Sequence, residues 1–483
     1  MYIGIDIGTS GVKTVLLNEL GNVVDSHTSP LTVNRPKPLW SEQNPIDWWI
    51  ATVDGLKNLA IKNNLHEVKA IGLTGQMHGA VLLDEHGNVL RPAILWNDGR
   101  SFEECQELEA KIESIHSICG NLIMPGFTAP KLLWVAKNEP EIFSKTSMVL
   151  LPKDYIRYKL TGLYATDMSD AAGTMWLDVA KRDWSEEILK ACNLSRKNMP
   201  TLFEGTDITG KLASDIAREL NLKEIPVVAG ASDNSAGAIG VGITKPGQAM
   251  ISLGTSGVYF AVSDGYLSNP QSAVHSFCHS LPKTWHLMSV ILSAASCLTW
   301  VAKLTGFESV PVMLEAVEKS DLKNNDIYFL PYLSGERTPH NNPHAKGVFF
   351  GMTHETTKVN LCHAVLEGVG FAFADGLIVL EQSGIQPTDT TLIGGGSRDS
   401  FWRQMLADIL QRTLTFREGG DVGPALGAAR LAHIAIAGTD CIDRICPVPN
   451  LKEIHKPNLE LAAYYHNRHM KWQRIYKQLV SIF

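Results

Sequence analysis

The segment Gly-Thr-Ser-Gly-Val occurs twice in this sequence, at 8–12 and at 254–258, and constrains the fold more than any other feature. In both copies an apolar, β-forming run precedes the segment and a second apolar run follows it. A strand, a tight glycine-containing turn and a second strand make a β-hairpin. The two copies lie about half of the 483-residue chain apart. The repeat therefore predicts two halves of similar architecture, each beginning with the same hairpin.

Other strand-like runs end in Gly-rich turns and lead into helical patterns, at 68–79, 225–242 and 390–410. Strands that alternate with helices predict an α/β fold, and a chain of this length predicts at least two domains. Ser397 is a candidate N-cap for the clearest of these helices.

The two halves are expected to meet near residue 245. A turn-forming Thr-Lys-Pro-Gly cluster at 244–247 comes just before the second hairpin. We therefore expect an N-terminal domain of residues 1–245 and a C-terminal domain of residues 246–483. The final stretch, 458–483, has apolar residues, Met470 among them, at helical spacing, which predicts an amphipathic helix packed on the second domain.

Composition narrows the class of protein and its surroundings. The net charge is −7 and no long run of Lys or Arg occurs, which argues against a nucleic-acid partner. Eight cysteines without a CxxC pair suit a reducing compartment, so we expect a cytoplasmic protein. The N-terminus lacks the basic region of a signal peptide. The longest apolar candidate, 286–302, is interrupted by serines, so no membrane partner is expected.

The residues of the repeated turn suit the binding of phosphate groups. Small Gly, Thr and Ser residues let the backbone approach phosphate oxygens, and their N–H and hydroxyl groups can donate hydrogen bonds. Two such turns that face each other would bind a triphosphate, whereas one such turn is more often only a turn. The chain contains neither a P-loop motif nor the Gly-x-Gly-x-x-Gly fingerprint of dinucleotide-binding folds.

One position distinguishes the two copies of the hairpin. Asp6 precedes the first turn, and Ser252 is its counterpart before the second. A carboxylate beside phosphates would repel them unless a cation lay between. Asp6 is therefore a candidate partner of Mg²⁺, acting through a water molecule. The alternative is a structural Asp whose carboxylate accepts hydrogen bonds from backbone donors of the turn.

A second candidate site lies at 231–242, where a strand ends and a helix rich in Gly and Ala begins. Ligands of α/β proteins usually bind at such strand ends. Transfer of a phosphoryl group to a hydroxyl needs a base positioned on that hydroxyl. Asp233 is the candidate base, and Asn234 is a candidate hydrogen-bonding neighbour of the substrate. The alternative is that Asp233 only caps the helix.

Polar and aromatic residues at 74–80 and 95–100 suit a polyhydroxylated ligand. A sugar needs paired polar partners and an aromatic or apolar wall, and these segments offer His78, Trp96, Asn97, Asp98 and Arg100. A lone His in such a run is more often structural. Three glycines at 394–396 would let adenine and ribose lie against the backbone, or would form only a tight turn.

Together these segments resemble the FGGY family of carbohydrate kinases. The resemblance runs from Met1 to about residue 440 and includes, besides the motifs above, the stretches 126–140, 151–162, 169–178, 332–343 and 421–432. It implies two actin-like (ribonuclease H-like) domains with the active site in the cleft between them. It also implies ATP and Mg²⁺ as cofactors, and it suggests a homodimer.

The resemblance assigns roles to residues at matching positions. Asp233 matches the catalytic base, and Asp6 matches the Mg²⁺-linked carboxylate. The sugar site would consist of Met77, His78, Asp233 and Asn234, with Trp96 and Asp98 as further candidates. The residues at ATP-binding positions are Gly8, Thr9, Ser10, Lys13, Gly254, Thr255, Ser256, Gly394, Gly395 and Gly396. Ser232 precedes the candidate base where relatives often have Gly.

The Met77–His78 pair is typical of the branch of the family that phosphorylates D-xylulose. The resemblance therefore implies ATP-dependent formation of D-xylulose 5-phosphate. One alternative is a sister kinase that acts on ribulose, fuculose, gluconate or glycerol. The other is a non-catalytic actin- or Hsp70-like ATPase, against which the sugar-type segments at 74–80 and 95–100 argue.

Overall fold

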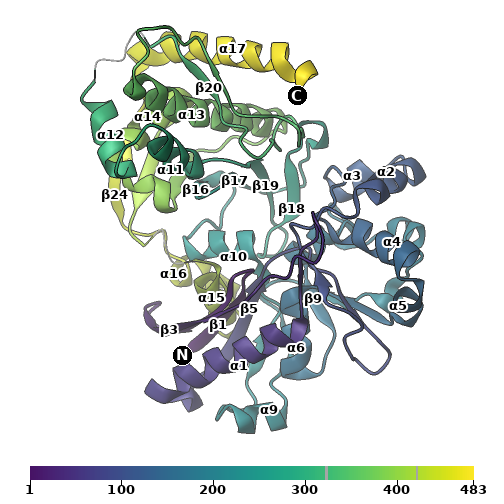
Figure 1. The fold of residues 1–483 in the computed structure, drawn as a ribbon. Helices are drawn as coiled ribbons and strands as arrows, with labels where there is room; N and C mark the ends of the chain where they lie inside the picture. Colours follow the sequence, from purple (N-terminus) through teal and green to yellow (C-terminus); the bar gives the residue numbers. More distant parts are fainter. Residues whose placement is uncertain (321–324, 420–422) are drawn as a thin grey trace.

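The computed structural model describes residues 1–320, 325–419 and 423–483, which form two lobes, each built on a seven-stranded mixed sheet (Figure 1). The order in the N-terminal sheet is β13 (Ile208–Lys211), β14 (Pro226–Val228), β5 (Ala70–Gly75), β1 (Tyr2–Ile7), β2 (Gly11–Leu17) and β3 (Val23–Pro30), with β15 (Ala231–Ser232) also paired to β5. The order in the C-terminal sheet is β18 (His275–Cys278), β19 (Trp285–Ile291), β17 (Gly257–Ser263), β16 (Gln248–Leu253), β22 (Asp389–Ile393), β23 (Leu414–Arg417) and β24 (Leu451–His455).

The repeated hairpin that the sequence predicts is confirmed in both sheets. β1 and β2 pair antiparallel with Asp6 opposite Lys13, and β16 and β17 pair antiparallel with Ser252 opposite Val258. In each sheet the first hairpin strand pairs in parallel with a later strand, β5 or β22. The second hairpin strand pairs antiparallel with β3 or β19. The two sheets therefore repeat one strand plan, as the duplicated segment predicts.

Helices and short strand pairs complete the lobes. The N-terminal helices are α1 (Pro45–Lys62), α2 (Phe102–Lys111), α3 (Ile115–Cys119), α4 (Thr128–Asn138), α5 (Pro140–Lys145), α6 (Pro152–Thr161), α7 (Met168–Ala171), α8 (Glu186–Ala191), α9 (Ser214–Glu219) and α10 (Asp233–Gly240). The C-terminal helices are α11 (Ala295–Leu304), α12 (Val310–Glu318), α13 (Lys358–Gln382), α14 (Ser400–Leu410), α15 (Gly423–Ala437), α16 (Ile442–Ile445) and α17 (Ala462–Leu479). The short pairs are β4 (Glu42–Gln43) with β7 (Ala93–Ile94), β6 (Val81–Leu83) with β8 (Met148–Leu150), β9 (Ala165–Asp167) with β12 (Thr201–Phe203), β10 (Leu177–Asp178) with β11 (Asp183–Trp184), and β20 (Tyr328–Leu330) with β21 (Val348–Phe350).

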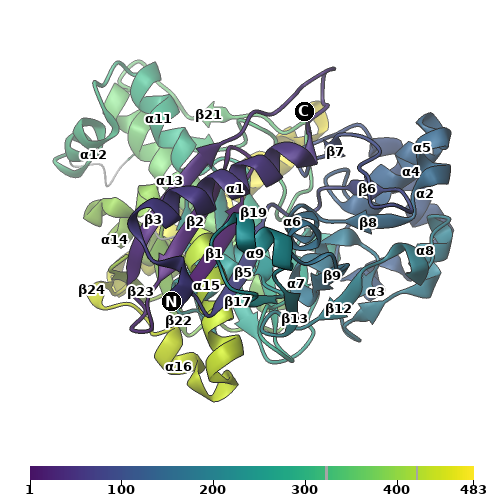
Figure 2. The same ribbon diagram turned by 90° about the horizontal axis from the view of Figure 1, so that it is seen from below.

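Helix α1 shows how the sequence places a layer on the N-terminal sheet (Figure 2). The Asn44 side chain caps the helix by accepting a hydrogen bond from the backbone N–H of Ile46, and Pro45 occupies the first turn, where its missing N–H costs nothing. Trp48 and Leu56 are fully buried on the face that packs against β2 and β3. The helix therefore forms one layer over the hairpin edge of this sheet.

Helix α15 belongs to the C-terminal half of the sequence but packs on the N-terminal sheet, against β1, β5 and α10. Its backbone lies very close to two paired strand residues. A Cβ atom at Gly4 would meet the Ala425 carbonyl oxygen at 1.9 Å, and one at Gly72 would meet the Ala428 oxygen at 1.9 Å. All strands of the N-terminal sheet precede residue 245 in the sequence, and all strands of the C-terminal sheet follow it. Helix α15 also follows residue 245 but packs on the N-terminal sheet. The boundary at 245 stays a prediction.

Among the described residues, one helix, α13, is long and apolar enough to cross a membrane by length and composition. However, 94% of its most apolar window is buried inside the protein. It packs against β19, β20, α11 and α14, so it is the central core helix of the C-terminal lobe. The apolar run at 286–302 is not a single element, because it spans most of β19 and part of α11.

The structure corrects two local expectations, and part of a third lies outside the described residues. Asp399, not Ser397, caps α14, because its carboxylate accepts from the backbone N–H of Trp402. The C-terminal helix is confirmed as α17, but Met470 is 57% exposed and contributes little to its packed face. Of the family-like stretch 421–432, residues 421 and 422 lie outside the described residues.

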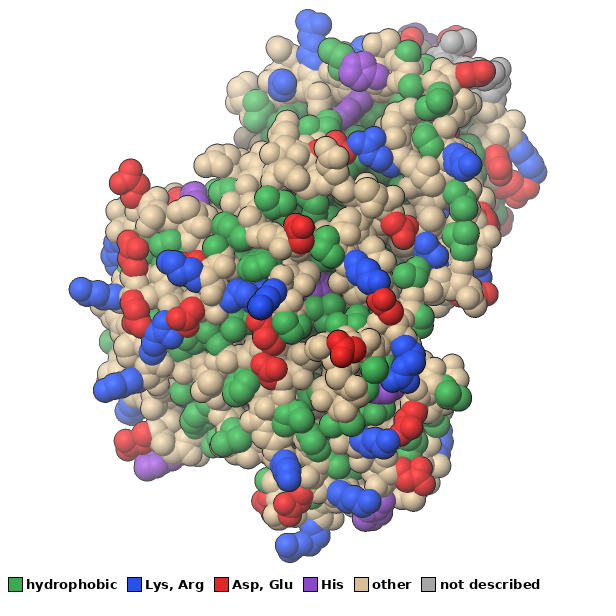
Figure 3. Space-filling model, turned by 180° about the vertical axis from the view of Figure 1, so that it is seen from behind, with side chains coloured by type: hydrophobic (Ala, Val, Ile, Leu, Met, Phe, Trp, Pro, Cys, Tyr) green, Lys and Arg blue, Asp and Glu red, His purple; other side chains and the backbone are tan. Residues whose placement is uncertain are grey.

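The face of the molecule shown in Figure 3 carries both signs of charge. Lys and Arg side chains lie among Asp and Glu side chains and form no extended basic area on this face. Exposed ion pairs on the surface of the protein include Lys57 with Glu219 at 3.0 Å and Lys245 with Asp443 at 2.7 Å. The face in Figure 3 therefore offers no continuous track of cations for a phosphate backbone.

Candidate active site

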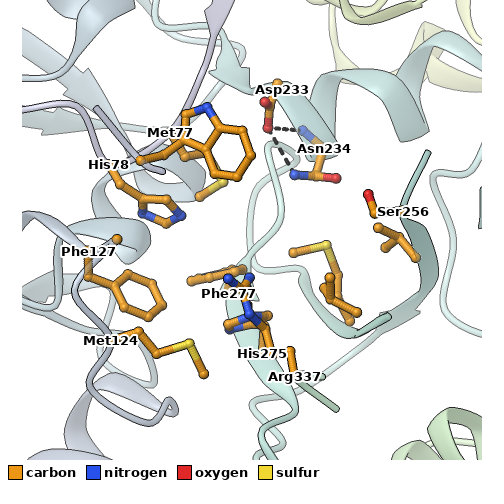
Figure 4. A pocket seen from close by; sticks show the side chains of 15 residues that line it. Met77, His78, Met124, Phe127, Asp233, Asn234, Ser256, His275, Phe277 and Arg337 are labelled. Atoms are coloured by element: carbon orange, nitrogen blue, oxygen red, sulfur yellow. Dashed lines mark hydrogen bonds between the residues drawn. The ribbon is translucent and has the colours of Figure 1, made fainter. Parts of the chain in front are cut away.

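A cavity of about 290 Å³ lies between the two lobes and has the size of a small-molecule site (Figure 4). The N-terminal half contributes Met77, His78, Trp96, Met124, Gly126, Phe127, Asp233 and Asn234 to its lining. The C-terminal half contributes Ser256, Val258, His275, Phe277, Met288, Val290 and Arg337. Five of the six sugar-site candidates are thus brought together, next to one residue of the second hairpin turn.

Asp233 is the first residue of α10, so its side chain reaches the cavity from the end of a strand. The backbone N–H and the side-chain amide of Asn234 both donate to Oδ1 of Asp233, at 2.7 and 2.9 Å. Among the described residues, nothing donates to Oδ2, which is left to accept a proton. Burial raises the pKa of Asp233 to about 6, and the two bonds from Asn234 oppose that rise.

The backbone around Asp233 is fixed from the N-terminal lobe. Ser232 occupies the N-cap position of α10, so the alternative that Asp233 caps this helix is wrong. The backbone N–H of Ser232 donates to Oγ of Ser169 at 3.0 Å. Ser169 in turn is bonded through its hydroxyl to the buried carboxylate of Asp167 at 2.5 Å. A buried chain of hydrogen bonds therefore positions the residue that precedes the candidate base.

Asp6 lies close enough to Asp233 for the two carboxylates to interact. Burial and the negative charge of Asp233 raise the pKa of Asp6 to about 7, and Lys13 opposes the rise. A divalent cation near both groups would remove this repulsion. Within residues 1–320, 325–419 and 423–483, no three His, Cys, Asp or Glu side chains form a metal cage. A cation here would therefore take most of its ligands from phosphate and water.

The first hairpin turn is connected directly to the sugar-site candidates. The hydroxyl of Thr9 donates to Oε1 of Gln76 at 3.0 Å and accepts from Nε1 of Trp96 at 3.0 Å. Gln43 donates to the Thr9 carbonyl at 2.8 Å and accepts from the Gln76 amide at 3.0 Å. Since a hydroxyl has one proton, that of Thr9 is already used in this structure. Phosphate contacts by Thr9 would therefore come from its backbone N–H.

The second hairpin turn is held from behind by the start of α11. The backbone N–H groups of Ala294 and Ala295 donate to the carbonyls of Thr255 and Gly254, both at 2.9 Å. Ser296 donates through its hydroxyl to the Thr255 carbonyl at 2.7 Å. The carbonyls of Gly254 and Thr255 therefore point toward the start of α11, while the side chains of Thr255 and Ser256 remain exposed. This arrangement leaves donors, rather than acceptors, for a phosphate group.

Gly394, Gly395 and Gly396 follow β22 beside the second hairpin, but they do not line the cavity. Gly394 has a φ of 86°, and a Cβ atom at Gly396 would meet Trp402 at 2.9 Å. Only Gly395 has open space around its missing side chain. Two of the three glycines are thus explained by backbone conformation and packing, and a flat ligand group would find room at Gly395.

His78 adopts a left-handed backbone conformation with a φ of 68°, which is uncommon for a residue other than Gly. Nδ1 of its ring donates to the Gly173 carbonyl at 2.6 Å, so the neutral ring presents Nε2 as an acceptor. Burial lowers the pKa of His78 to about 3, which keeps the ring neutral. Lys131 and Thr128 donate to the His78 carbonyl at 2.8 and 3.2 Å and hold this conformation.

Asp98 is the one sugar-site candidate that the structure does not place at the cavity. It is buried, and its carboxylate forms an ion pair with Arg100 at 2.7 Å and accepts from the backbone N–H of Ser41 at 2.6 Å. Arg100 also pairs with Glu42 at 2.8 Å. The segment 95–100 therefore supplies Trp96 to the cavity wall, while its charged residues fix the loop that carries Trp96.

Four lining residues with aromatic or cationic side chains were not among the sequence-based candidates: Phe127, His275, Phe277 and Arg337. Phe127 and Arg337 lie in the family-like stretches 126–140 and 332–343, so the resemblance contained a signal for them. His275 and Phe277 lie on β18, where no motif marks them. Their rings stack at 5.6 Å and form an aromatic wall across from Phe127.

The sequence matches two family models, described as the N-terminal domain of the FGGY family of carbohydrate kinases over residues 1–240 and its C-terminal domain over residues 249–436. The chain belongs to the FGGY family of carbohydrate kinases. This FGGY kinase is 59% identical to the xylulose kinase of Escherichia coli (strain K12) over 482 residues, which cover 100% of both chains. It is also 59% identical to that of Klebsiella pneumoniae, with 99% of both chains covered.

Among solved structures, the FGGY kinase resembles a xylulose kinase from Brucella ovis with a TM-score of 0.96, at 45% identity and with 100% of both chains covered. The similarity confirms the predicted fold class of two actin-like domains with helices around mixed sheets. The protein is an enzyme of the carbohydrate kinase class, and the alternative of a non-catalytic ATPase is not supported.

Proposed function

We propose that this kinase transfers the γ-phosphoryl group of ATP to O5 of D-xylulose and releases D-xylulose 5-phosphate and ADP. The observation that carries the proposal is the cavity, in which Asp233 lies among polar and aromatic side chains suited to a sugar and beside the second hairpin turn. One carboxylate oxygen of Asp233 accepts from no described residue. The 59% identity to xylulose kinases over the whole chain supports the choice of sugar.

The chemistry follows from these positions. The 5-hydroxyl of the ketose would lie at Oδ2 of Asp233, and its oxygen would attack the γ-phosphorus as the bond to the β,γ-bridging oxygen breaks. The hydroxyl proton passes to Asp233, which is mostly ionised at neutral pH because its pKa is about 6. The electron pair of the broken bond leaves with ADP. Positioning and charge stabilisation supply most of the rate enhancement in such transfers.

The donors of the two hairpin turns would bind the phosphates, through backbone N–H groups and the hydroxyl of Ser256. Gly395 offers the open surface for the nucleoside. When bound, Mg²⁺ would neutralise charge on the phosphates, and Asp6 is the carboxylate placed to hold it through water. Asp6 fits this role because burial and the nearby Asp233 make its own charge unfavourable without a cation.

The proposed activity is tested with a panel of D-xylulose, D-ribulose, L-fuculose, D-gluconate and glycerol, with ADP release as the readout. We expect the highest kcat/KM with D-xylulose. Asp233→Asn should lower kcat by about 10²-fold or more, because the base is lost, while ATP still binds. A higher kcat/KM for another sugar would assign the protein to a sister kinase. ATP hydrolysis that no sugar stimulates would contradict kinase activity altogether.

We further propose that the enzyme acts in the cytoplasm. All eight cysteines are free thiols and seven of them are buried, which suits a reducing environment. The homodimer suggested by the resemblance stays a prediction.

A further inference from the structure

Arg337 reaches the cavity from the C-terminal lobe, on the side away from Asp233 (Figure 4). It follows β20 in a loop that is tied to β19, because Thr338 exchanges hydrogen bonds with the backbone of Val290 at 3.0 Å. The loop is therefore firmly placed on the C-terminal sheet. Its guanidinium group is half-buried and faces the residues that the N-terminal lobe contributes.

The charge of Arg337 has no carboxylate partner among residues 1–320, 325–419 and 423–483. Its neighbour Glu336 turns away and uses Oε1 to accept from the backbone N–H groups of Leu292 and Arg337, at 2.9 and 2.7 Å. Burial raises the pKa of Glu336 to about 8, so this side chain is largely neutral at pH 7. A half-buried cation without a partner is unfavourable for stability. Such a group is typical of a site that binds a ligand acceptor.

Among the described residues, the guanidinium group makes only one hydrogen bond. Asn121 donates its amide protons to the carbonyls of Cys119 and Ser276, at 2.8 and 2.9 Å, so its Oδ1 is an acceptor. The ring of His275 must therefore donate from Nδ1 to that oxygen at 2.9 Å, which leaves Nε2 as an acceptor. Arg337 contacts this Nε2 through Nη1 at a long 3.4 Å. Its other N–H groups remain for a ligand.

The cavity thus offers an acceptor and a donor away from the base. The acceptor is Nε2 of His78, and the donor is the guanidinium group of Arg337. A ketose has a matching pair at its C1–C2 end: the O1 hydroxyl, which can donate, and the O2 carbonyl, which can only accept. A polyol carries a hydroxyl at C2, whose oxygen can also accept from Arg337 but whose proton then needs an acceptor of its own.

We propose that Arg337 donates to the O2 carbonyl of the bound ketose and selects ketoses over polyols from the C-terminal lobe. The inference rests on the proposed function, which places O5 at Asp233 and so directs C1 and C2 toward Arg337 and His78. It also means that both lobes contact the sugar, so the complete specificity site forms only when they lie together.

The test compares D-xylulose with xylitol, which has the same chain length and no carbonyl, in the full-length protein. Arg337→Met should raise KM for D-xylulose by roughly 10- to 100-fold, the range for a lost hydrogen bond to a charged group. The affinity for xylitol, measured as KM or as a competitive inhibition constant, should change by roughly threefold or less. KM for ATP should stay near its wild-type value. Arg337→Lys should recover part of the preference for D-xylulose.

Glu336→Gln is the matched control, because it changes the adjacent residue of the same loop without touching the cavity. It should keep the wild-type ratio of xylulose to xylitol affinities. The melting temperature of Arg337→Met should equal or exceed that of wild type, since an unpaired charge is removed. Equal losses on both sugars, a loss confined to ATP, or a clear drop in melting temperature would overturn the inference. Wild-type enzyme that prefers another sugar would instead refute the proposed function.

Discussion

In Asp233, the proposed base, Oδ1 accepts two hydrogen bonds from Asn234, and no described residue donates to Oδ2. This division matters because the same two hydrogen bonds also set how readily the base ionises. Burial alone would favour the protonated, inactive form, and the bonds from Asn234 favour the ionised form. The residue that orients the proposed base would therefore also adjust the pH at which this base works.

The expected consequence is an acid limb in the pH profile of kcat/KM for D-xylulose. Because the pKa of Asp233 is about 6, kcat/KM should fall about tenfold for each pH unit well below that value. Asn234→Ala removes one hydrogen bond to the ionised form, so the limb should move to higher pH. Steady-state rates from about pH 4.5 to 8 measure both profiles. A limb centred below about pH 5, or one that Asn234→Ala leaves in place, would contradict this account.

At the scale of elements, the first hairpin and the strand exit after β5 act as one unit. The hydroxyl of Thr9 in the turn donates to Gln76, which precedes the candidate sugar-binding pair Met77 and His78. The same hydroxyl accepts from Trp96 in the cavity wall. Gln43 closes the network and is itself held by Nε1 of Trp48 on α1 at 3.0 Å. These hydrogen bonds therefore fix the position of the proposed phosphate-binding turn relative to the proposed sugar-binding wall.

A double-mutant cycle with Trp96→Phe and Thr9→Val tests this connection. Each change removes one partner of the hydrogen bond between Trp96 and Thr9; Thr9→Val keeps the shape of the side chain, and Trp96→Phe keeps an aromatic ring. Each should lower kcat/KM, and the double variant should lose less than the product of the two effects. The coupling free energy should be about 1 kcal/mol, the usual contribution of one hydrogen bond. Independent, multiplicative losses would show that the two sites are not connected through Thr9.

At the scale of the whole molecule, α15 ties the lobes together. It lies in the C-terminal half of the sequence, yet Leu426, Ala429 and Ala432 pack with Tyr2 and Ala70 of the N-terminal sheet. Gly4 and Gly72, which are paired across β1 and β5, allow the backbone of this helix to approach the sheet. The N-terminal lobe therefore lacks part of its core without the C-terminal half of the chain.

Gly72→Val should consequently destabilise the entire protein rather than one loop. The new side chain would begin 1.9 Å from the Ala428 carbonyl oxygen, so α15 would have to move. We expect a loss of about 3 kcal/mol or more in the free energy of unfolding, measured by urea denaturation. Gly265→Ala is the control, since no heavy atom lies within 4 Å of its added Cβ, and its change should stay within about 0.5 kcal/mol. Equal stability of the two variants would contradict the packing argument.

Much of this protein could be predicted from local patterns in its sequence. The repeated Gly-Thr-Ser-Gly-Val segment determined both hairpins, because strand periodicity and glycine turns act over a few residues. The strand-to-helix change at 231–242 likewise determined that Asp233 would stand at a strand end. His78 and Trp96 could be predicted as cavity residues because each lies in a short polar segment after a strand, whereas Met77 was assigned only by its match to the family motif.

The tertiary structure alone decided which side chains face the cavity and which are used elsewhere. Asp98 and Trp96 share one short segment, but a buried ion pair with Arg100 turns the carboxylate away from the cavity. Arg337 enters the cavity only because the two lobes meet, and α15 crosses between them because two glycines leave space for its backbone. The contacts of Arg337 and α15 with the N-terminal lobe join residues that lie far apart in the sequence. They depend on packing and desolvation in three dimensions, which no local sequence pattern encodes.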